Sequence, residues 1–346
     1  MSEQTQDQSS SEVFVIAEIG SNHNGDLETA KRMVSWSAEA GAQAAKFQTF
    51  SADTLYSTKA PRLTEMANFA GVEDTVTPHQ LAKSLEMDRS WHSILAEHCK
   101  AEGIEFMSTP FDLDAVDELD PFVSRHKLAS FDLDNQPLVE RVASKGKPIV
   151  LSTGHAYLGE IERSLAWIEN VSPGLDVNVL HCTSQYPTKY EDVNLASMQT
   201  IASAFGTEVG LSDHSIGIDV SLAAVALGAT VLERHVTEDR SNSGPDHHFA
   251  LQPEDLRALV QGAERIRRSI GSPVKQPTVA EEENRRLARR SIHIIHDLPV
   301  GHMVTSDDIA LLRPALGILP EHLEITLGRE LRVAKTAGEP LRWGDV

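Results

Sequence analysis

Two short apolar segments each run into a histidine: Val209-Gly210-Leu211-Ser212-Asp213-His214 and Thr230-Val231-Leu232-Glu233-Arg234-His235. The Ala-rich segment 219–227 separates them and predicts a helix, so the stretch from 209 to 246 predicts a β-α-β unit. Because neighbouring parallel strands end at the same edge of a sheet, we expect His214 and His235 to lie close together. Two imidazoles in that position suit one divalent metal ion. The alternative is a pair of buried, hydrogen-bonded histidines.

Apolar and amphipathic segments alternate along the chain before this unit. The first segment, Val13–Ala17, is wholly apolar, as expected of a strand that is covered on both faces. With the opening pair, the apolar segments make eight strands over about 260 residues, which matches a (β/α)8 TIM barrel. An open doubly wound sheet is the alternative, but the Gly-x-Gly-x-x-Gly pattern of a dinucleotide site is absent after the first strand. The five strands predicted between the first one and the opening pair cover 44–47, 105–111, 126–130, 148–154 and 177–184.

The chain divides into four parts by composition. Residues 1–12 are polar and predict a disordered tail, without the basic start and apolar core of a signal peptide. The barrel domain takes 13–270, and a polar linker with two prolines takes 271–288. Residues 289–346 predict a small β-rich domain. Three finer expectations concern a long insertion typical of a lid at 51–78 and strands in the small domain at 291–295 and 331–333.

Composition excludes several classes of protein. The 346 residues carry a formal net charge of −20, which argues against nucleic acid or an anionic membrane as a partner. No run of 18 apolar residues is present, so no transmembrane helix is predicted. The two cysteines, Cys99 and Cys182, suit a reducing cytoplasm. An anionic small substrate stays compatible with this charge, because a local basic pocket can dominate inside a cleft.

Polar side chains end most of the predicted strands, and in a barrel they would all meet at one mouth. Lys46 and Lys127, flanked by hydroxyl groups, suit a phosphate or a phosphate-plus-carboxylate ligand. The alternatives are a Schiff-base lysine and simple pairing with Glu18, which is otherwise the best general acid or base. The other residues expected near the mouth are Gln48, Thr109, Ser130, Ser152, Ser184, Ser212 and His155.

Several further residues receive structural or supporting roles. Cys182 lies in an apolar segment and is expected in the core, and His181 beside it is expected to be structural. Asp213 and Asp246 are expected to hold water or a metal-binding histidine. For the two histidines at 247–248 we expect solvated side chains on a loop.

The motifs, taken together, resemble the sialic acid synthases. The resemblance runs from about Val13 to the end of the chain, and the part from Arg289 onward resembles the antifreeze-like (SAF) domain of the same enzymes. It implies condensation of phosphoenolpyruvate with an N-acetylated amino sugar, usually N-acetylmannosamine, to a nine-carbon 2-keto acid. The motifs that carry it are 17-AEIGSNHNG-25, 46-KFQTF-50, 108-STPF-111, 151-LSTG-154, 181-HCTS-184, 212-SDH-214 and 244-GPDH-247.

The resemblance also implies residue roles. A Mn²⁺ or Mg²⁺ ion would be held by His214 and His235, and Glu18 would act on water and the tetrahedral intermediate. Arg313 would enter the barrel mouth of a partner subunit, which implies a domain-swapped homodimer. The positions matching phosphoenolpyruvate contacts are Lys46, Thr109, Lys127, Ser130, Ser152 and Ser184, and those near the sugar are Gln48, Tyr186 and Asp246.

The exact sugar stays open at the level of sequence. At Phe131 the chain resembles the pseudaminic acid synthases, whose sugar is 6-deoxy. At 191–195 and in the Gly-Pro-Asp-His run it resembles the neuraminate and legionaminate branch. A condensation on a sugar phosphate is a second enzymatic hypothesis, which the small domain and Arg313 argue against. A catalytically inactive sugar-binding barrel is the alternative of another class, and the intact set of Glu18, two lysines and two histidines argues against it.

Overall fold

A computed structural model describes residues 12–60 and 76–346 of the chain. The predicted tail, apart from Glu12, lies outside the described residues. The chain forms two compact units, Met1–Gly271 and Ser272–Val346, which are described separately below. None of the helices in the described ranges is long and apolar enough to cross a membrane.

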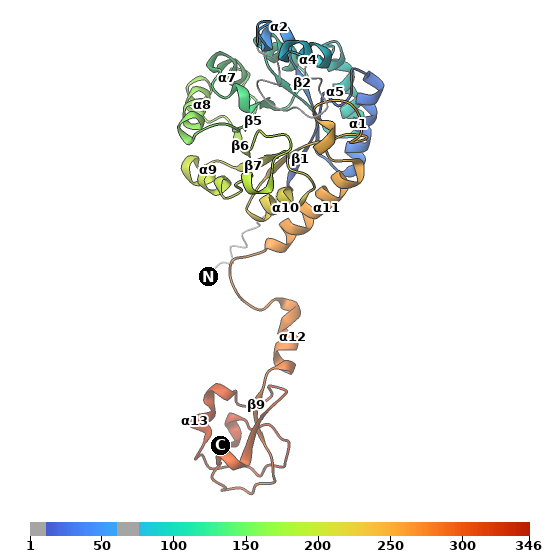
Figure 1. The fold of residues 1–346 in the computed structure, drawn as a ribbon. Helices are drawn as coiled ribbons and strands as arrows, with labels where there is room; N and C mark the ends of the chain where they lie inside the picture. The colour runs from blue at the N-terminus through green and yellow to red at the C-terminus, as the bar shows by residue number, and fades with distance from the viewer. Residues whose placement is uncertain (1–11, 61–75) are drawn as a thin grey trace. The chain divides into compact units, whose positions relative to one another are not determined.

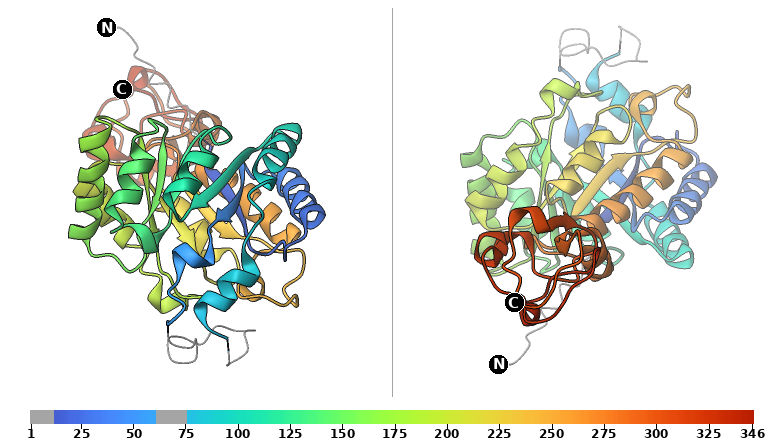
Figure 2. Two further views of the ribbon diagram at one scale, coloured as in Figure 1. Left: turned by 90° about the horizontal axis from the view of Figure 1, so that it is seen from above. Right: turned by 90° about the horizontal axis from the view of Figure 1, so that it is seen from below.

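The first unit is an eight-stranded parallel sheet curled into a barrel and surrounded by helices (Figures 1 and 2). Its strand order is β3-β2-β1-β8-β7-β6-β5-β4, so β1 pairs with both β2 and β8 and the sheet is nearly closed. This confirms the predicted TIM barrel rather than an open doubly wound sheet. The strands are β1 (Phe14–Gly20), β2 (Ala44–Thr49), β3 (Glu105–Pro110), β4 (His126–Leu128), β5 (Ile149–Ser152), β6 (Val177–Cys182), β7 (Val209–Asp213) and β8 (Val231–His235).

The helices follow the strands with local signals at their ends. For example, Asp26 caps α1 by accepting a hydrogen bond from Thr29 N, and Gly41 ends that helix at φ 94°. The helices of the first unit are α1 (Leu27–Ala40), α2 (Ala52–Leu55), α4 (Pro78–Leu85), α5 (Trp91–Glu102), α6 (Leu113–Leu119), α7 (Gln136–Ala143), α8 (Leu158–Val171), α9 (Ser197–Phe205), α10 (Asp219–Ala226) and α11 (Pro253–Ile270).

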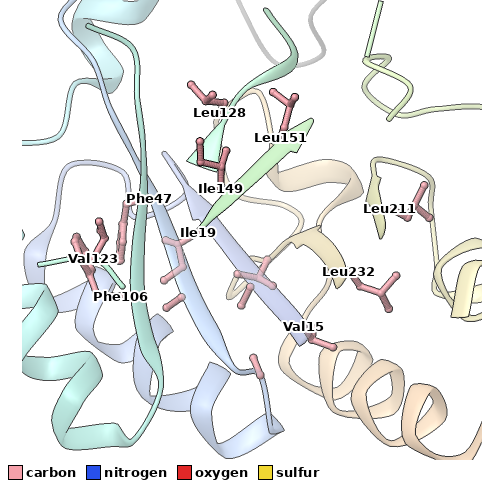
Figure 3. Close-up of a cluster of buried hydrophobic side chains, with 14 of the residues drawn as sticks. Val15, Ile19, Phe47, Phe106, Val123, Leu128, Ile149, Leu151, Leu211 and Leu232 are labelled. Atoms are coloured by element: carbon pink, nitrogen blue, oxygen red, sulfur yellow. The ribbon is translucent and has the colours of Figure 1, made fainter. Parts of the chain in front are cut away.

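Each strand buries both of its faces. The outward-facing side chains, among them Val15, Phe47, Phe106 and Leu232, pack under the helices in one large apolar cluster (Figure 3). The inward-facing side chains fill the barrel with a second apolar layer: Ile16, Ala44, Met107, Val150, Leu180 and Val231. This two-sided burial explains why the strands appear as continuous apolar runs.

Next to the inner apolar layer, the alternation of side chains along each strand places a second, mostly polar layer inside the barrel. Side chains two positions apart point to the same face of a strand, so the residue two places after each inner apolar residue also points into the barrel. Gly210 belongs to the inner layer, where a Cβ would approach Leu180 Cδ2 and the Val231 carbonyl oxygen to 2.4 Å. The residues two places further along these strands are Glu18, Lys46, Thr109, Ser152, Cys182, Ser212 and Glu233.

The described parts of the insertion after β2 contain two helices. It forms α2, and α4 begins at its end with Thr77 as a cap and Pro78 in its first turn. Phe50, Ala52 and Ala82 form a small apolar cluster of their own there. Residues 61–75, in the middle of the predicted lid, lie outside the described residues.

The second unit differs in detail from the sequence prediction. The predicted linker contains a helix, α12 (Val279–Ala288), which begins at a Thr278 capping box that the sequence analysis overlooked. The predicted strand at 291–295 is confirmed as β9 (Ser291–Ile294), which pairs antiparallel with β10 (Ile309–Leu312). The strand predicted at 331–333 is wrong, because Leu331 is buried in the small core without forming a ladder. The remaining helix of this unit is α13 (Leu323–Thr326).

Candidate active site

A pocket of about 480 Å³ opens at the carboxyl ends of the barrel strands. Strand ends in a TIM barrel are the usual place for catalytic groups, because they all point to one face. Of the barrel residues predicted near the mouth from sequence, Ser184 and His155 are missing from the lining. The polar side chains that line it are Glu18, Ser21, Lys46, Gln48, Thr109, Lys127, Ser130, Asp132, Ser152, Tyr186, Ser212, His214, Glu233, His235 and Asp246.

Two ammonium groups and two carboxylates share the floor of this pocket. Lys46 Nζ lies 2.6 Å from Glu18 Oε2 and 3.5 Å from Glu233 Oε2. Lys127 Nζ lies 3.9 Å from Glu233 Oε1. All four side chains are almost completely buried, so the charges interact strongly and each depends on the others. The pairing of Lys46 with Glu18, weighed at the level of sequence, is therefore present, but it belongs to a larger cluster.

Hydroxyl groups surround the two lysines. Lys46 donates a hydrogen bond to Thr109 Oγ1 at 3.1 Å, and Lys127 donates to Ser152 Oγ at 2.7 Å. The two ammonium groups and these hydroxyls all come from the strands of the barrel, so a rigid frame holds them. An anionic ligand would find several hydrogen-bond donors converging on one place.

Glu233 lies between the two lysines and was not predicted as a site residue from the sequence. Its position could have been predicted, because it lies two residues before His235 on the same strand and must face the same way. Ser212 donates a hydrogen bond to Glu233 Oε1 at 3.1 Å. Glu233 Oε2 is buried without a hydrogen-bond partner, which leaves it open to a ligand or water.

The two carboxylates of the floor have different acidities. Burial raises the pKa of Glu18 to about 7, even though the Lys46 ammonium group acts in the opposite direction. Burial also acts to raise the pKa of Glu233, but the ammonium groups of Lys127 and Lys46 outweigh it and lower that pKa. Two neighbouring acids whose pKa values move apart can take different roles, with Glu18 able to exchange a proton near neutral pH.

The two histidines lie beside this cluster, as the β-α-β unit predicts. Their ring centroids are 5.3 Å apart, and Tyr186 packs 4.3 Å from the His214 ring. His214 Nδ1 lies 3.1 Å from the Thr183 carbonyl oxygen, and in the neutral ring it can donate to that oxygen and leave the lone pair of Nε2 for a metal ion. His235 Nδ1 is buried without a hydrogen-bond partner and lies 3.6 Å from Asp246 Oδ2.

These donors fit a divalent cation that is completed by other ligands. Burial, and then the positive charge nearby, lowers the pKa of His235 well below its usual range, so the ring is neutral and can donate a lone pair. Within residues 12–60 and 76–346, no three His, Cys, Asp or Glu side chains are gathered closely enough to hold an ion alone. Water or substrate oxygens would therefore supply the remaining ligands.

With the geometry in place, comparison with known proteins identifies the family. The chain matches the NeuB family over residues 33–275 and the SAF domain over residues 289–346. The chain belongs to the NeuB family. This membership confirms the resemblance to the sialic acid synthases and to their antifreeze-like domain.

Named members of the family resemble the chain along most of its length. It is 41% identical to the N,N'-diacetyllegionaminic acid synthase of Legionella pneumophila, over 98% of this chain and 96% of that protein. It is 33% identical to the human N-acetylneuraminate-9-phosphate synthase, over 92% and 89% of the two chains. The crystal structure of an N-acetylneuraminic acid synthetase from Leptospira borgpetersenii superposes with a TM-score of 0.71 at 35% identity, covering 80% of this chain and 90% of that one.

The NeuB-type mouth places Ser184 just behind its lining. A Cβ on Gly154 would come within 2.1 Å of Ser184 Oγ and 3.0 Å of Ser130 Oγ, so only glycine fits there. Gly154 N itself donates to Ser130 Oγ at 2.8 Å. On the other side of the mouth, Gln48 Nε2 donates to Glu18 Oε1 at 2.8 Å, which orients that carboxylate.

Asp213 does not support a histidine as predicted. It points away from the barrel interior, where it forms a buried ion pair with Arg234 NH1 at 2.5 Å and accepts from Ser221. Strand alternation explains the error, because Asp213 and Arg234 face outward while their neighbours Ser212 and Glu233 face inward. The pair therefore joins β7 to β8 behind the site.

The remaining predicted residues have mixed outcomes. His181 is structural, with Nε2 2.6 Å from the Val193 carbonyl oxygen. Cys182 is buried as expected but also lines the pocket, 3.9 Å from His214 Nδ1. The prediction of a solvated side chain is wrong for His247, which is buried. His155 is exposed, and its ring lies 5.3 Å from that of Phe131.

One wall of the pocket is apolar. It is formed by α2, α4 and the residues beside them in the insertion, together with the loops after β3 and β4. Phe131 is 60% exposed and Tyr56 is 41% exposed, so these rings are available to a ligand. The apolar side chains that line this wall are Phe50, Leu55, Tyr56, Pro78, Leu81, Ala82, Leu85, Phe111 and Phe131.

Arg313 follows β10 in the second unit. Its side chain is exposed there. Its predicted role in another subunit stays a prediction.

Proposed function

We propose that this protein is a nonulosonic acid synthase that condenses phosphoenolpyruvate with an acetamido sugar and releases phosphate. The observation that carries the proposal is the buried cluster of Lys46, Lys127, Glu18 and Glu233 beside two histidines. An inactive sugar-binding barrel has no need of a carboxyl group with a pKa near 7 at such a place. The two unpaired, buried cysteines agree with our assignment of the protein to the cytoplasm.

In this proposal, the chain's own residues bind the anion and move one proton. Lys46 and Lys127, with Thr109 and Ser152, hold the phosphate and carboxylate groups of phosphoenolpyruvate. C3 of the enol ester forms a bond to the aldehyde carbon of the open-chain sugar, and water adds to C2. Glu18 accepts a proton of that water and returns it to the aldehyde oxygen, which has become an alkoxide. Breaking the bond between C2 and the phosphate oxygen then expels inorganic phosphate, which takes up the proton of the remaining C2 hydroxyl, and leaves the 2-keto acid.

The histidine pair would hold Mn²⁺ or Mg²⁺. The bound ion would supply Lewis-acid polarisation of the sugar's aldehyde oxygen. Tyr186, Gln48 and Asp246 border the same part of the pocket and would orient the sugar.

We further propose a 6-deoxy diacetamido sugar, the type used for legionaminic acid, over N-acetylmannosamine. The apolar wall that contains Phe131 and Tyr56 suits a methyl group better than a hydroxymethyl group. The legionaminic acid synthase of Legionella pneumophila is also 41% identical to this chain.

The first test is phosphate release from phosphoenolpyruvate with Mn²⁺ and a panel of free and phosphorylated sugars. We expect kcat/KM for the 6-deoxy diacetamido sugar to exceed that for N-acetylmannosamine by about 10-fold or more, because one group in an apolar pocket is worth about 1–3 kcal/mol. A preference for N-acetylmannosamine would refute the finer proposal. Turnover with sugar phosphates alone, or none with any sugar, would refute the proposed function.

Removal of the divalent ion should abolish turnover. Chelation should stop phosphate release, and added Mn²⁺ should restore it, because His214 and His235 have free lone pairs to bind the ion. His214→Ala and His235→Ala should each lose activity and bind Mn²⁺ more weakly in a calorimetric titration, while their circular dichroism spectra stay unchanged. His155→Ala, an exposed histidine outside the lining, is the matched control. Full activity of a metal-free mutant would show that this assignment is wrong.

The small domain should complete the site of another subunit through Arg313. A guanidinium can donate several hydrogen bonds to the hydroxyl and acetamido groups of a sugar. Losing one such contact to a neutral ligand should cost about 0.5–1.5 kcal/mol. Lys46→Met chains have low activity at a phosphoenolpyruvate concentration well below their raised KM. Refolded together with Arg313→Ala chains and assayed at that concentration, they should regain activity above both parents, because some mixed dimers hold one intact site. An active monomer, or no gain on mixing, would contradict the shared site.

A further inference from the structure

Two loops at the carboxyl end of the barrel are joined by the side chain of His247. One loop follows β1 and contains Asn24, and the other follows β8 and contains His247 itself. His247 Nδ1 lies 2.7 Å from the Thr237 hydroxyl, and its Nε2 lies 3.2 Å from Asn24 Oδ1. A neutral ring that accepts from Thr237 and donates to Asn24 satisfies both nitrogens at once. This buried histidine therefore has a complete set of partners, one in each loop.

The backbone of both loops has a feature that accommodates this contact. Asn24 has a φ of 52°, in the left-handed region that asparagine tolerates better than most residues. Gly244 packs against the ring so closely that a Cβ would lie 2.8 Å from His247 Cδ2. A second hydrogen bond joins the loops, from Asn22 Nδ2 to the Val236 carbonyl oxygen at 2.8 Å. Two side-chain hydrogen bonds therefore join the loop after β1 to the loop after β8.

The contact lies directly beside the sugar side of the pocket. Asp246 precedes His247 in the chain, and its Oδ2 is 3.6 Å from His235 Nδ1. Three polar side chains converge on Gly20, because a Cβ there would lie near an atom of each: Glu18 Oε1 at 3.2 Å, Gln48 Nε2 at 3.3 Å and Asp246 Oδ2 at 3.7 Å. Asp246 reaches this place from a loop, whereas Glu18 and Gln48 belong to strands. Its position therefore depends on what holds that loop.

We infer that His247 is a positioning residue, which holds the Asp246 carboxylate beside His235 by joining the loop after β8 to Asn24. Its consequence for catalysis rests on the proposed function. Lys46 and Lys127, which would bind phosphoenolpyruvate, come from strands and do not depend on this loop. Loosening the loop should therefore affect the sugar far more than phosphoenolpyruvate.

The kinetic test compares His247→Ala, Asn24→Ala and the double variant. We expect each single variant to raise the KM for the sugar, or to lower kcat, by about 10-fold to 100-fold, because a displacement of about 1 Å has such effects. The KM for phosphoenolpyruvate should stay within about twofold of wild type, since the strands keep their place. The double variant should be no worse than the singles, because both remove the same contact.

Two further variants make the test specific. His248→Ala is the matched control, because that ring packs on Phe249 at 5.2 Å and neither of its nitrogens has a hydrogen-bond partner. It should behave as wild type. His247→Gln should recover most of the activity, because its amide can donate to Asn24 in place of Nε2. Equal damage to both Michaelis constants, or equal damage in His248→Ala, would overturn the inference.

Hydrogen exchange of the ligand-free protein separates this inference from the proposed function. Amides in segment 240–249 should exchange faster in His247→Ala and Asn24→Ala than in wild type and His248→Ala. Unchanged exchange would refute the positioning role whatever the activity. A wild-type protein without turnover would refute the proposed function and leave the exchange result to decide on the contact.

Discussion

Replacing Glu18 with glutamine is expected to lower kcat by about 10²–10⁴-fold, the usual contribution of a positioned general base. Glutamine keeps the shape of the side chain and its contact with Gln48, but it cannot accept a proton from water. The KM for phosphoenolpyruvate should change little, because Lys46 and Lys127 remain in place. Phosphate release under saturating sugar measures the effect.

The pH dependence of kcat/KM in the wild type tests whether Glu18 acts as a base or as an acid. Glu18 must be ionised to accept a proton, and its pKa is raised to about 7, so kcat/KM should rise as the pH increases through about 7. Glu18→Gln should lack this rise. A rate that instead falls through the same range would show that Glu18 acts as an acid.

A matched substitution controls for the loss of one carboxylate from the barrel. Glu105 pairs with Arg125 at 2.9 Å at the start of β3, the opposite end from the pocket. Glu105→Gln should keep the rate and the pH profile of the wild type. Nearly full activity in Glu18→Gln would remove Glu18 from the mechanism.

Replacing Lys46 or Lys127 with methionine is expected to raise the KM for phosphoenolpyruvate by about 10-fold to 100-fold or more. A hydrogen bond to a charged group contributes about 1.5–3 kcal/mol, and each 1.4 kcal/mol is tenfold in affinity. The KM for the sugar should change much less. Because methionine leaves buried carboxylates with fewer counter-charges, thermal unfolding of each variant must show that it is folded.

The same lysines also decide between two chemistries. The proposal has both of them bind the substrate without a covalent bond, so borohydride should trap no lysine–substrate adduct in wild type. Lys100→Met, which changes an exposed lysine on α5, is the control and should leave both Michaelis constants unchanged. A reduced imine at Lys46 or Lys127 would establish a Schiff-base aldolase instead.

Local pattern was enough to predict the barrel. Apolar runs of strand length, separated by amphipathic helices, have few ways to bury both faces of every strand. The residues at the strand ends then meet at one mouth whatever the details of the loops, which is why Lys46, Thr109, Ser152 and His235 line the pocket. The reaction itself was predicted only from the resemblance of the motifs to those of the family.

Strand alternation separates the residues that were placed well from those that were not. The alternation itself is local, but which face of a fully buried strand turns inward is a tertiary property, because only the curvature of the barrel decides it. Glu233 was overlooked, although β8 turns it inward, and Asp213 was given a role at the site, although β7 turns it outward. In a run buried on both faces, hydrophobicity carries no signal of direction.

The barrel, the small domain and the polar mouth could be predicted from the residues alone, because short-range periodicity and composition encode them. Which charged groups interact, and which loops are joined, depends on the tertiary structure. The acidity of Glu18 depends on burial and on Lys46 across the β1–β2 ladder, and His247 is held by Asn24, a residue 223 positions away. Such contacts depend on distances in space, which the order of residues along the chain does not contain.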